Sequence, residues 1–264
     1  MDLGLNKRVA LVAASSQGLG KAIASSLARE GANVVICSRS AKNLQAAEED
    51  IRATAAEVET LTVVADLTQP QDIEKLVEKT VERFGTVHIL VNNAGGPPPG
   101  FFSELNDESW QMTVDLILMS SVRLTRAVLP FMKKQRWGRI INVTSVSVKQ
   151  PIDELLLSNS LRLSVIGWAK TLSNQVAKDG ILINNVCPGW TRTERVAELI
   201  QALAASQGKT PEEIDHSITS NIPIARMGKP EELANLVVFL ASERASYLTG
   251  TSIQVDGGSV KSIY

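Results

Sequence analysis

Short apolar runs alternate with amphipathic stretches along the entire chain. Seven of these runs are rich in β-branched residues and predict strands, at residues 9–14, 33–38, 60–65, 89–92, 139–144, 181–186 and 252–255. Several are apolar at every position, as expected of strands that are covered on both faces. The intervening stretches carry a helical period; Leu19, Ile23 and Leu27, for example, lie one helical turn apart before Gly31.

The order of these elements predicts the fold class. A regular alternation of strand and helix favours parallel strands joined by right-handed crossovers. The chain is therefore predicted to be an α/β protein with a single Rossmann-type doubly wound parallel sheet of about seven strands and helices on both faces. No shift in composition, low-complexity tract or internal repeat marks a second domain, so residues 1–264 are predicted to form one domain.

One region, at about 193–226, departs from the alternation because it is largely helical and polar. An insertion at this point of a doubly wound sheet lies near the carboxyl ends of the strands, where ligands bind. It is predicted to be a lid over the substrate, and a plain surface excursion is the alternative.

Composition excludes several classes of partner. The chain has 27 basic and 28 acidic residues, for a net charge of −1, which does not favour binding to nucleic acid or to an anionic membrane. No apolar run approaches the ~20 residues of a membrane span, and the N-terminus lacks the pattern of a secretory signal. Cys37 and Cys187 lie inside apolar runs, which predicts buried free thiols in a reducing compartment. We therefore expect a cytoplasmic protein without a metal site.

The first predicted strand runs into the segment AASSQGLG, residues 13–20, and then into a helix. A strand, a tight glycine-bearing turn and a helix N-terminus together form an anion site, since backbone N–H groups and the helix dipole face the ligand. The segment is predicted to hold the pyrophosphate of a dinucleotide; an ordinary strand–helix turn is the alternative.

The residues at the end of the second predicted strand indicate which of two dinucleotides the site prefers. An NAD(H) site carries an acidic residue there for the ribose diol, whereas this chain has Cys37-Ser38-Arg39-Ser40. A guanidinium can bind a 2′-phosphate through two hydrogen bonds, so NADP(H) is favoured over NAD(H). The alternative is a solvated arginine at the start of the next helix.

Five segments in a fixed order carry a resemblance to a known family. They are AASSQGLG, Asp66 after the third strand, NNAG at 92–95, Pro188-Gly189 with Thr193, and VDGG at 255–258. Over nearly its whole length the chain resembles the short-chain dehydrogenase/reductase family, and within it the 3-oxoacyl-carrier-protein reductases. The resemblance implies a dinucleotide-binding domain and an oxidoreductase of ketone and alcohol substrates.

The resemblance also implies a set of residues that contact the cofactor. Those implied at the pyrophosphate are Ser15, Ser16, Gln17, Gly18, Leu19 and Gly20. Those implied at the adenosine are Ser38 and Arg39 for the ribose and its phosphate, and Asp66 and Leu67 for the adenine. Those implied along the rest of the cofactor are Asn93, Ala94, Gly95, Pro188, Gly189, Thr191 and Thr193. The family usually has Thr-Gly where this chain has Ala13-Ala14, so Ala14 must adopt a backbone angle that glycine adopts more easily.

The family's catalytic residues are a serine, a tyrosine, a lysine one helical turn later and an asparagine. Ser145 matches the serine, Ser158 stands at the tyrosine position, Arg162 at the lysine position and Ile117 at the asparagine position. Both tyrosines of the chain, at 247 and 264, follow the last large predicted helix. The resemblance therefore implies an atypical catalytic site.

These replacements change the acid–base chemistry. Tyrosine has a pKa of ~10, a serine hydroxyl is a far weaker acid, and a guanidinium does not release its proton in proteins. Arg162 can still stabilise a developing negative charge. Lys149, Asp153 or Glu154, in the loop after Ser145, is a candidate proton source, although solvated loop charges are the alternative. Ser158 and Arg162 are alternatively a helix N-cap region and a surface arginine.

Three interpretations follow. The first is an NADP(H)-binding oxidoreductase of a 3-oxoacyl or other ketone or alcohol substrate, with Ser145, Ser158 and Arg162 as its catalytic residues. The second is a catalytically impaired dinucleotide-binding sensor or partner subunit, and the third is a slow relic. We favour the enzyme.

Two further expectations concern partners and substrate. The predicted helix 109–134 is apolar on more than one face, and the resemblance places it in a subunit interface, so we expect a homotetramer or homodimer.

Aromatic and leucine side chains are candidates for an apolar substrate pocket, with the protein core as the alternative. They are Phe101, Phe102, Trp110, Leu155, Leu156 and Trp190.

Overall fold

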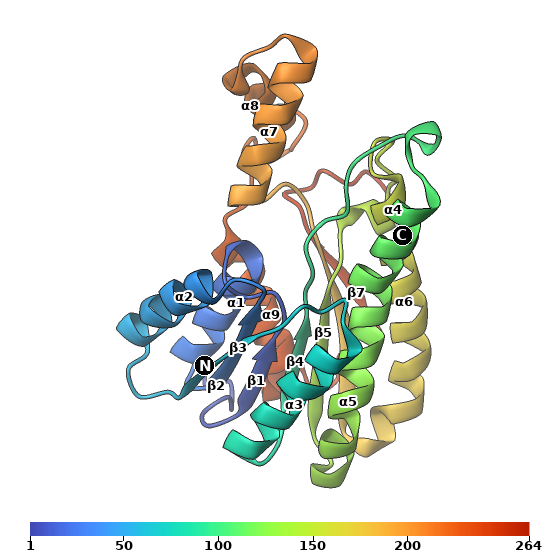
Figure 1. The fold of residues 1–264 in the computed structure, drawn as a ribbon. Helices are drawn as coiled ribbons and strands as arrows, with labels where there is room; N and C mark the ends of the chain where they lie inside the picture. The colour runs from blue at the N-terminus through green and yellow to red at the C-terminus, as the bar shows by residue number, and fades with distance from the viewer. Residues whose placement is uncertain (264) are drawn as a thin grey trace.

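The strands form one parallel sheet in the order β3-β2-β1-β4-β5-β6-β7, with seven strands in the described part of the chain (Figure 1). The computed structural model describes residues 1–263. The strands are β1 (Val9–Val12), β2 (Asn33–Ser38), β3 (Thr60–Val64), β4 (Ile89–Asn92), β5 (Gly138–Val143), β6 (Ile181–Pro188) and β7 (Ser252–Val255). The order reverses beside β1, which confirms the predicted doubly wound sheet.

Helices cover both faces of the sheet (Figure 1). One layer contains α1 (Gly18–Arg29), α2 (Ala41–Thr54) and α9 (Pro230–Ala241). The other contains α3 (Pro70–Phe84), α5 (Ser120–Gln135) and α6 (Leu156–Val176). Along β1, Ala10 and Val12 pack into the first layer while Val9 and Leu11 pack into the second. This alternation explains why the predicted strands are apolar at every position.

The region predicted to be a lid contains two helices, α7 (Glu194–Gln207) and α8 (Pro211–Thr219). Figure 1 shows them standing apart from the sheet. They have a small apolar cluster of their own, which includes Ile200 and Ile214. At the base of the region, the flanking residues Thr191 and Gly228 pair with each other in an isolated parallel β-bridge. These contacts make α7 and α8 a unit that packs mainly against itself.

The predicted helix 109–134 is present within one uninterrupted helical run over residues 107–135, with a π-helical segment in its middle. It consists of α4 (Asp107–Thr113), a π-helical segment η2 (Val114–Met119) and α5. Within η2, the Ile117 carbonyl accepts a hydrogen bond of 3.1 Å from the Ser121 hydroxyl. Such π segments often lie at functional sites, and this one packs against α6.

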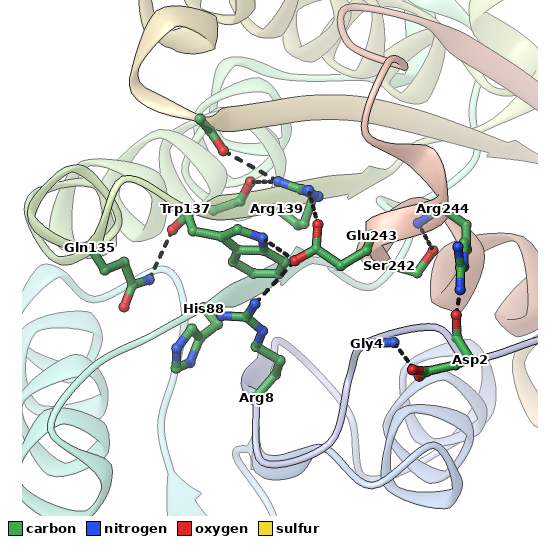
Figure 2. A network of polar contacts seen from close by, with 12 residues as sticks. Asp2, Gly4, Arg8, His88, Gln135, Trp137, Arg139, Ser242, Glu243 and Arg244 are labelled. Atoms are coloured by element: carbon green, nitrogen blue, oxygen red, sulfur yellow. Dashed lines mark hydrogen bonds and ion pairs between the residues drawn. The ribbon is translucent and has the colours of Figure 1, made fainter.

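A polar cluster at the amino ends of the strands connects distant parts of the chain (Figure 2). The guanidinium carbons of Arg8 and Arg139 lie 3.9 and 4.3 Å from the centroid of the Trp137 ring. The Glu243 carboxylate accepts hydrogen bonds from Trp137 Nε1 at 2.8 Å and Arg8 Nη2 at 3.1 Å. Nearby, His88 Nδ1 accepts from the Val9 N–H, and burial, with a smaller effect of the Arg8 charge, lowers the pKa of His88 to about 4. The cluster connects β1, β5 and the short helix η5 (Glu243–Ala245).

Both cysteines are free and buried, as the sequence predicts. Burial raises the pKa of the Cys37 thiol to about 12. None of the helices within residues 1–263 combines the length and the hydrophobicity that crossing a bilayer requires.

Candidate active site

The turn after β1 has a backbone shape that a dinucleotide site requires. Ala14 has φ +46° and Gly18 has φ +54°, both in the left-handed region. At Gly20, an added Cβ would lie 2.3 Å from the Ala14 carbonyl oxygen, so only glycine allows α1 to approach the turn this closely. The expected strain at Ala14, where the family usually has glycine, is therefore present.

Hydrogen bonds from two side chains hold this turn in place. Ser15 is fully buried; its hydroxyl donates to the Val12 carbonyl at 2.6 Å and accepts from the Cys37 N–H at 3.1 Å. Asn93 Nδ2 donates to the carbonyls of Ala13 and Ala14 at 3.2 and 3.1 Å. The turn is thus held against both β2 and the end of β4.

The N-terminus of α1 is left available to a ligand. Gln17 stands at the N-cap, but its side chain accepts from Asn43 Nδ2 at 3.2 Å rather than from the first-turn N–H groups. Uncapped N–H groups at a helix N-terminus bind anions, and the dipole adds to the attraction. The residues present therefore fit the pyrophosphate of a dinucleotide.

The Ala14→Gly variant is expected to be more stable than the wild-type protein. Glycine adopts φ +46° without the steric cost that alanine incurs there. Part of this gain is offset by the greater freedom of glycine in the unfolded chain, which leaves a net gain of about 1 kcal/mol in unfolding free energy. Thermal unfolding measures it, with Ala13→Gly as the control expected to lose stability. A lower melting temperature for Ala14→Gly would contradict the assignment of strain.

A cleft of about 620 Å³ runs from this turn along the carboxyl ends of the strands. It brings together most of the residues that the resemblance implies. They are Gln17, Gly18, Leu19, Gly20, Arg39, Asn93, Ala94, Gly95, Ser145, Ser158, Arg162, Pro188, Gly189, Thr191 and Thr193. One continuous cleft thus joins the expected pyrophosphate site to the expected catalytic residues.

Five implied cofactor residues do not line this cleft, namely Ser15, Ser16, Ser38, Asp66 and Leu67. Ser15 and Leu67 are buried. The Asp66 carboxylate accepts from the N–H and the hydroxyl of Thr68, and the Ser38 hydroxyl bonds to the backbone of Ser40. These contacts shape the loops beside the cleft.

Sequence reasoning missed the first turn of α7. Glu194, Arg195 and Glu198 line the cleft opposite the glycine-bearing turn. Thr193 caps this helix, since its hydroxyl accepts from the Val196 N–H at 3.3 Å. In the sequence, a capping threonine followed by charged residues indicates the start of a helix at Thr193. Only the position of α7 in the structure shows which of its residues reach the cleft.

Ser145 follows β5 and its hydroxyl has a fixed orientation. Its Oγ accepts a hydrogen bond of 3.1 Å from the Ser147 N–H, at the start of the short helix η3 (Val146–Val148). Because the oxygen already accepts from the backbone, the hydroxyl hydrogen remains available to a substrate oxygen in the cleft.

Arg162 is buried, with 8% of its surface exposed, so the interpretation as a surface arginine is wrong. Its Nε donates to Ser158 Oγ at 3.1 Å, and its Nη1 donates to the carbonyls of Val143 and Thr144 at 3.2 and 3.1 Å. Burial lowers the pKa of Arg162 to about 10. The guanidinium therefore joins α6 to the end of β5 and orients the Ser158 hydroxyl. Ser158 is itself buried and lies beyond Leu155, the N-cap residue of α6, so it is not the cap.

The remaining candidates for the catalytic site differ in how deeply their side chains are buried. Ile117 is buried in η2 and places an apolar side chain beside the site. Lys149 is half-buried, whereas Asp153 and Glu154 are exposed. Tyr247 is fully exposed, and Tyr264 lies outside the described residues.

The predicted apolar pocket is not assembled from its six candidates. Phe101 and Phe102 are 52% and 77% exposed, which excludes the core alternative for them. Trp190 packs against the cluster of α7 and α8, and Trp110 packs against Ile117 and Leu161. Leu155 and Leu156 are half-buried at the start of α6.

The fold is that of a dinucleotide-binding oxidoreductase. It combines a doubly wound sheet, a glycine-bearing turn, an uncapped helix N-terminus and hydroxyl groups at the far end of one cleft. Comparison with known proteins agrees. Residues 13–260 match the family described as enoyl-(acyl carrier protein) reductase. The chain belongs to the short-chain dehydrogenase/reductase family.

Individual relatives cover nearly the whole chain. The chain is 32% identical over 259 residues to the NADPH-dependent reductase BacG of Bacillus subtilis, covering 98% of this chain and 100% of that protein. It is 35% identical over 251 residues to the 3-oxoacyl-[acyl-carrier-protein] reductase FabG of Escherichia coli, covering 95% and 96%. Among solved structures, L-sorbose reductase from Gluconobacter frateurii, complexed with NADPH and L-sorbose, has a TM-score of 0.95 and 35% identity, with both chains fully covered.

Proposed function

We propose that this protein is an NADP(H)-dependent oxidoreductase that acts on a 3-oxoacyl or other ketone or alcohol substrate through an atypical catalytic site. The observation that carries the proposal is the single cleft in which the glycine-bearing turn, Arg39, Ser145 and Ser158 meet. The reductases among its relatives support the reaction class.

Two observations support NADP(H) as the cofactor. Arg39 is exposed, lines the cleft and stands where a carboxylate would select NAD(H). Relatives and solved neighbours are described as NADPH-dependent or NADPH-bound reductases. The bound cofactor supplies a hydride to a carbonyl carbon, or accepts one from an alcohol.

The residues of the far end of the cleft bind and polarise the substrate oxygen. The Ser145 hydroxyl accepts from the Ser147 N–H, and the Ser158 hydroxyl accepts from Arg162, so both direct their hydrogens toward an incoming oxygen. Arg162 adds positive charge behind Ser158, which stabilises negative charge that develops on that oxygen.

The second candidate function is a dinucleotide-binding sensor or partner subunit without turnover. It is favoured by the orientation of Arg162, whose Nη1 is directed at the backbone carbonyls of Val143 and Thr144 rather than at the cleft. In both cases residues 1–264 form one dinucleotide-binding domain, and residues 193–226 act as a lid on the substrate side.

We further propose that the protein acts in the cytoplasm as a homotetramer or homodimer. An apolar groove of about 540 Å³ on the outer faces of α5 and α6 supports a subunit contact there. It is lined by Val122, Leu129, Trp168 and Leu172, among others. The free buried cysteines fit a reducing compartment.

Cofactor titration tests the proposal. Wild-type protein is expected to bind NADPH more tightly than NADH, and Arg39→Asp to weaken NADPH binding at least ~10-fold, because a charge-assisted pair with the 2′-phosphate is replaced by repulsion. Quenching of the four tryptophans reports binding. Lys75→Asp makes the same change of charge on the exposed face of α3 and is expected to bind like wild type. Equal affinity of Arg39→Asp and wild type for NADPH would contradict the assignment of the adenosine site.

Turnover of a panel of ketones and 3-oxoacyl thioesters then separates the two candidate functions. The oxidoreductase is expected to oxidise NADPH in the presence of at least one substrate class. NADPH binding without turnover in wild type, together with turnover in the Ser158→Tyr/Arg162→Lys double variant, would support the sensor.

A further inference from the structure

The catalytic end of the cleft can hold a negatively charged oxygen, but its residues are poor proton donors. The hydroxyls of Ser145 and Ser158 are far weaker acids than a tyrosine, and the Arg162 guanidinium does not release its proton in proteins. Hydride addition to an isolated ketone produces an alkoxide, a strong base that a positioned acid protonates in the transition state. These residues therefore suit a reaction whose oxyanion does not need that acid.

Arg162 has unused hydrogen-bond donors and an unbalanced charge. Its Nε and Nη1 are bonded to Ser158 and to two backbone carbonyls, whereas its Nη2 donates to no atom within residues 1–263. Nη2 is not among the solvent-inaccessible side-chain atoms that lack a partner, so a ligand can reach it. No ion pair in the described part of the chain involves Arg162, although the residue is only 8% exposed. A buried cation of this kind is stabilised when an anion binds beside it.

Two hydroxyl groups with unused hydrogens lie in the same part of the cleft. Ser145 Oγ accepts from the Ser147 N–H and Ser158 Oγ accepts from Arg162 Nε, and neither hydroxyl donates to a protein atom within residues 1–263. Arg162 Nη1 also binds the carbonyl of Thr144, the residue before Ser145, at 3.1 Å. Ser145, Ser158 and Arg162 all line the cleft, and we refer to them as the oxyanion site.

A hydride acceptor that spreads its negative charge fits the oxyanion site best. When a hydride adds to the β carbon of an α,β-unsaturated carbonyl compound, the charge is shared between the carbonyl oxygen and the α carbon as an enolate. An enolate is a much weaker base than an alkoxide. A fixed cation and two hydroxyl donors can therefore stabilise it without giving up a proton.

We propose that the oxyanion site serves the reduction of a conjugated C=C bond, in an α,β-unsaturated ketone or acyl thioester, in preference to the reduction of an isolated C=O bond. The inference rests on the oxidoreductase function proposed above and names a substrate class for it.

The proposed reaction balances without a proton from the protein. The β carbon gains a C–H bond by accepting the hydride with its electron pair from NADPH, which is oxidised to NADP⁺. The π electrons of the C=C bond move between the α carbon and the carbonyl carbon, and those of the C=O bond move to the oxygen, which the oxyanion site holds. Water then protonates the α carbon, the C=O bond forms again, and hydroxide is released to solvent.

Isotope labels and paired substrates test the substrate class. Each enone or enoyl thioester of a panel is compared with its saturated counterpart, for example cyclohexenone with cyclohexanone. NADPH with deuterium at the transferred position is expected to label the β carbon of the enone, and heavy water is expected to label the α carbon. The saturated ketone is expected to react at least ~100-fold more slowly, because it lacks a positioned acid.

Variants connect this preference to the oxyanion site. Arg162→Met is expected to lose at least ~100-fold in enone turnover. The Ser158→Tyr/Arg162→Lys variant introduces an acid and is expected to raise turnover of the saturated ketone, relative to the enone, at least ~10-fold. Arg83→Met, at an exposed position of α3, is the matched control for the loss of an arginine and is expected to behave like wild type.

Binding of a phenol tests the oxyanion site without turnover, since a phenolate resembles an enolate in its charge and its flat shape. The protein is saturated with NADP⁺ at a pH where free para-nitrophenol is mostly un-ionised. The bound compound is expected to absorb as the phenolate in wild type and in Arg83→Met. Arg162→Met is expected to lose this absorbance although it still binds NADP⁺, because the cation that favours the ionised form is gone.

The outcomes are distinguishable. Saturated ketones that react as fast as enones, a ketone-to-enone ratio unchanged in the double variant, or no phenolate absorbance in wild type would overturn the substrate class and leave the oxidoreductase proposal intact. NADPH binding without turnover of any enone or ketone overturns both. Failure to bind NADPH overturns the proposed function at the level of the cofactor.

Discussion

Arg162→Met is expected to lower kcat at least ~100-fold while the protein stays folded and still binds NADPH. Methionine fills a similar volume but removes the donor to Ser158 Oγ and the positive charge behind it. The Ser158 hydroxyl then loses its fixed orientation at the point where negative charge develops. Steady-state kinetics and NADPH titration separate the effect on kcat from an effect on binding.

A double-mutant cycle tests whether Arg162 acts through Ser158. If it does, Ser158→Ala alone is expected to show a similar loss, and the Ser158→Ala/Arg162→Met variant is expected to be little worse than either single variant. Losses that multiply in the double variant would show that the two residues act independently. Arg162→Lys is expected to recover little, because an ammonium cannot reproduce the fork that spans Ser158 and two carbonyls.

Glu243→Ala is expected to lower the unfolding free energy by about 1–2 kcal/mol, because the Glu243 side chain is 46% exposed and solvent screens its ion pairs. In the cluster of Figure 2, Glu243 is the carboxylate shared by Arg8, Arg139 and Trp137. The Arg139 side chain is only 4% exposed, and burial, opposed by the charge of Glu243, lowers its pKa to about 10. Removing Glu243 leaves two neighbouring cations on one indole ring without a counter-charge.

Chemical denaturation at neutral pH measures this loss. Glu243→Gln is expected to lose less, because the amide oxygen still accepts from Trp137 Nε1 while the charge is removed. Glu82→Ala, at an exposed position of α3, controls for the loss of a glutamate elsewhere and is expected to change stability by less than about 0.5 kcal/mol. A Glu243→Ala protein as stable as wild type would show that Arg8 and Arg139 are sufficiently solvated without it.

The sequence was sufficient to predict the fold, because the period of apolar residues within each element and the alternation of strands with helices can both be recognised without knowing which distant residues are in contact. Strands β2, β4 and β7 have the predicted bounds, and the other strands differ by a few residues at their ends. β1 ends at Val12 rather than at Ala14, because Ala14 already turns into the left-handed region. The predicted helix 109–134 is present, but the π segment η2 inside it was not predicted, since it is defined by its i→i+5 hydrogen bonds rather than by a distinctive local composition.

Most of the residues predicted for the cofactor and all three predicted for catalysis line the same cleft. Glycine and hydroxyl residues of the first turn act through backbone shape, which their order along the chain largely specifies. The region 193–226 was expected near the ligand, but Glu194, Arg195 and Glu198 of α7 were not predicted to line the cleft, because the orientation of an inserted pair of helices depends on packing between distant residues.

The sequence by itself determined the doubly wound sheet, the glycine-bearing turn between β1 and α1, and the side chains at the positions where the family has its catalytic residues, because each follows from periodicity or from a short ordered motif. Only the tertiary structure decided that Arg162 is buried against the carbonyls of Val143 and Thr144 at the end of β5, and that it orients Ser158. The contact with the carbonyls is a relation between residues on different elements. Its geometry depends on how α6 and β5 pack together, which no local pattern encodes.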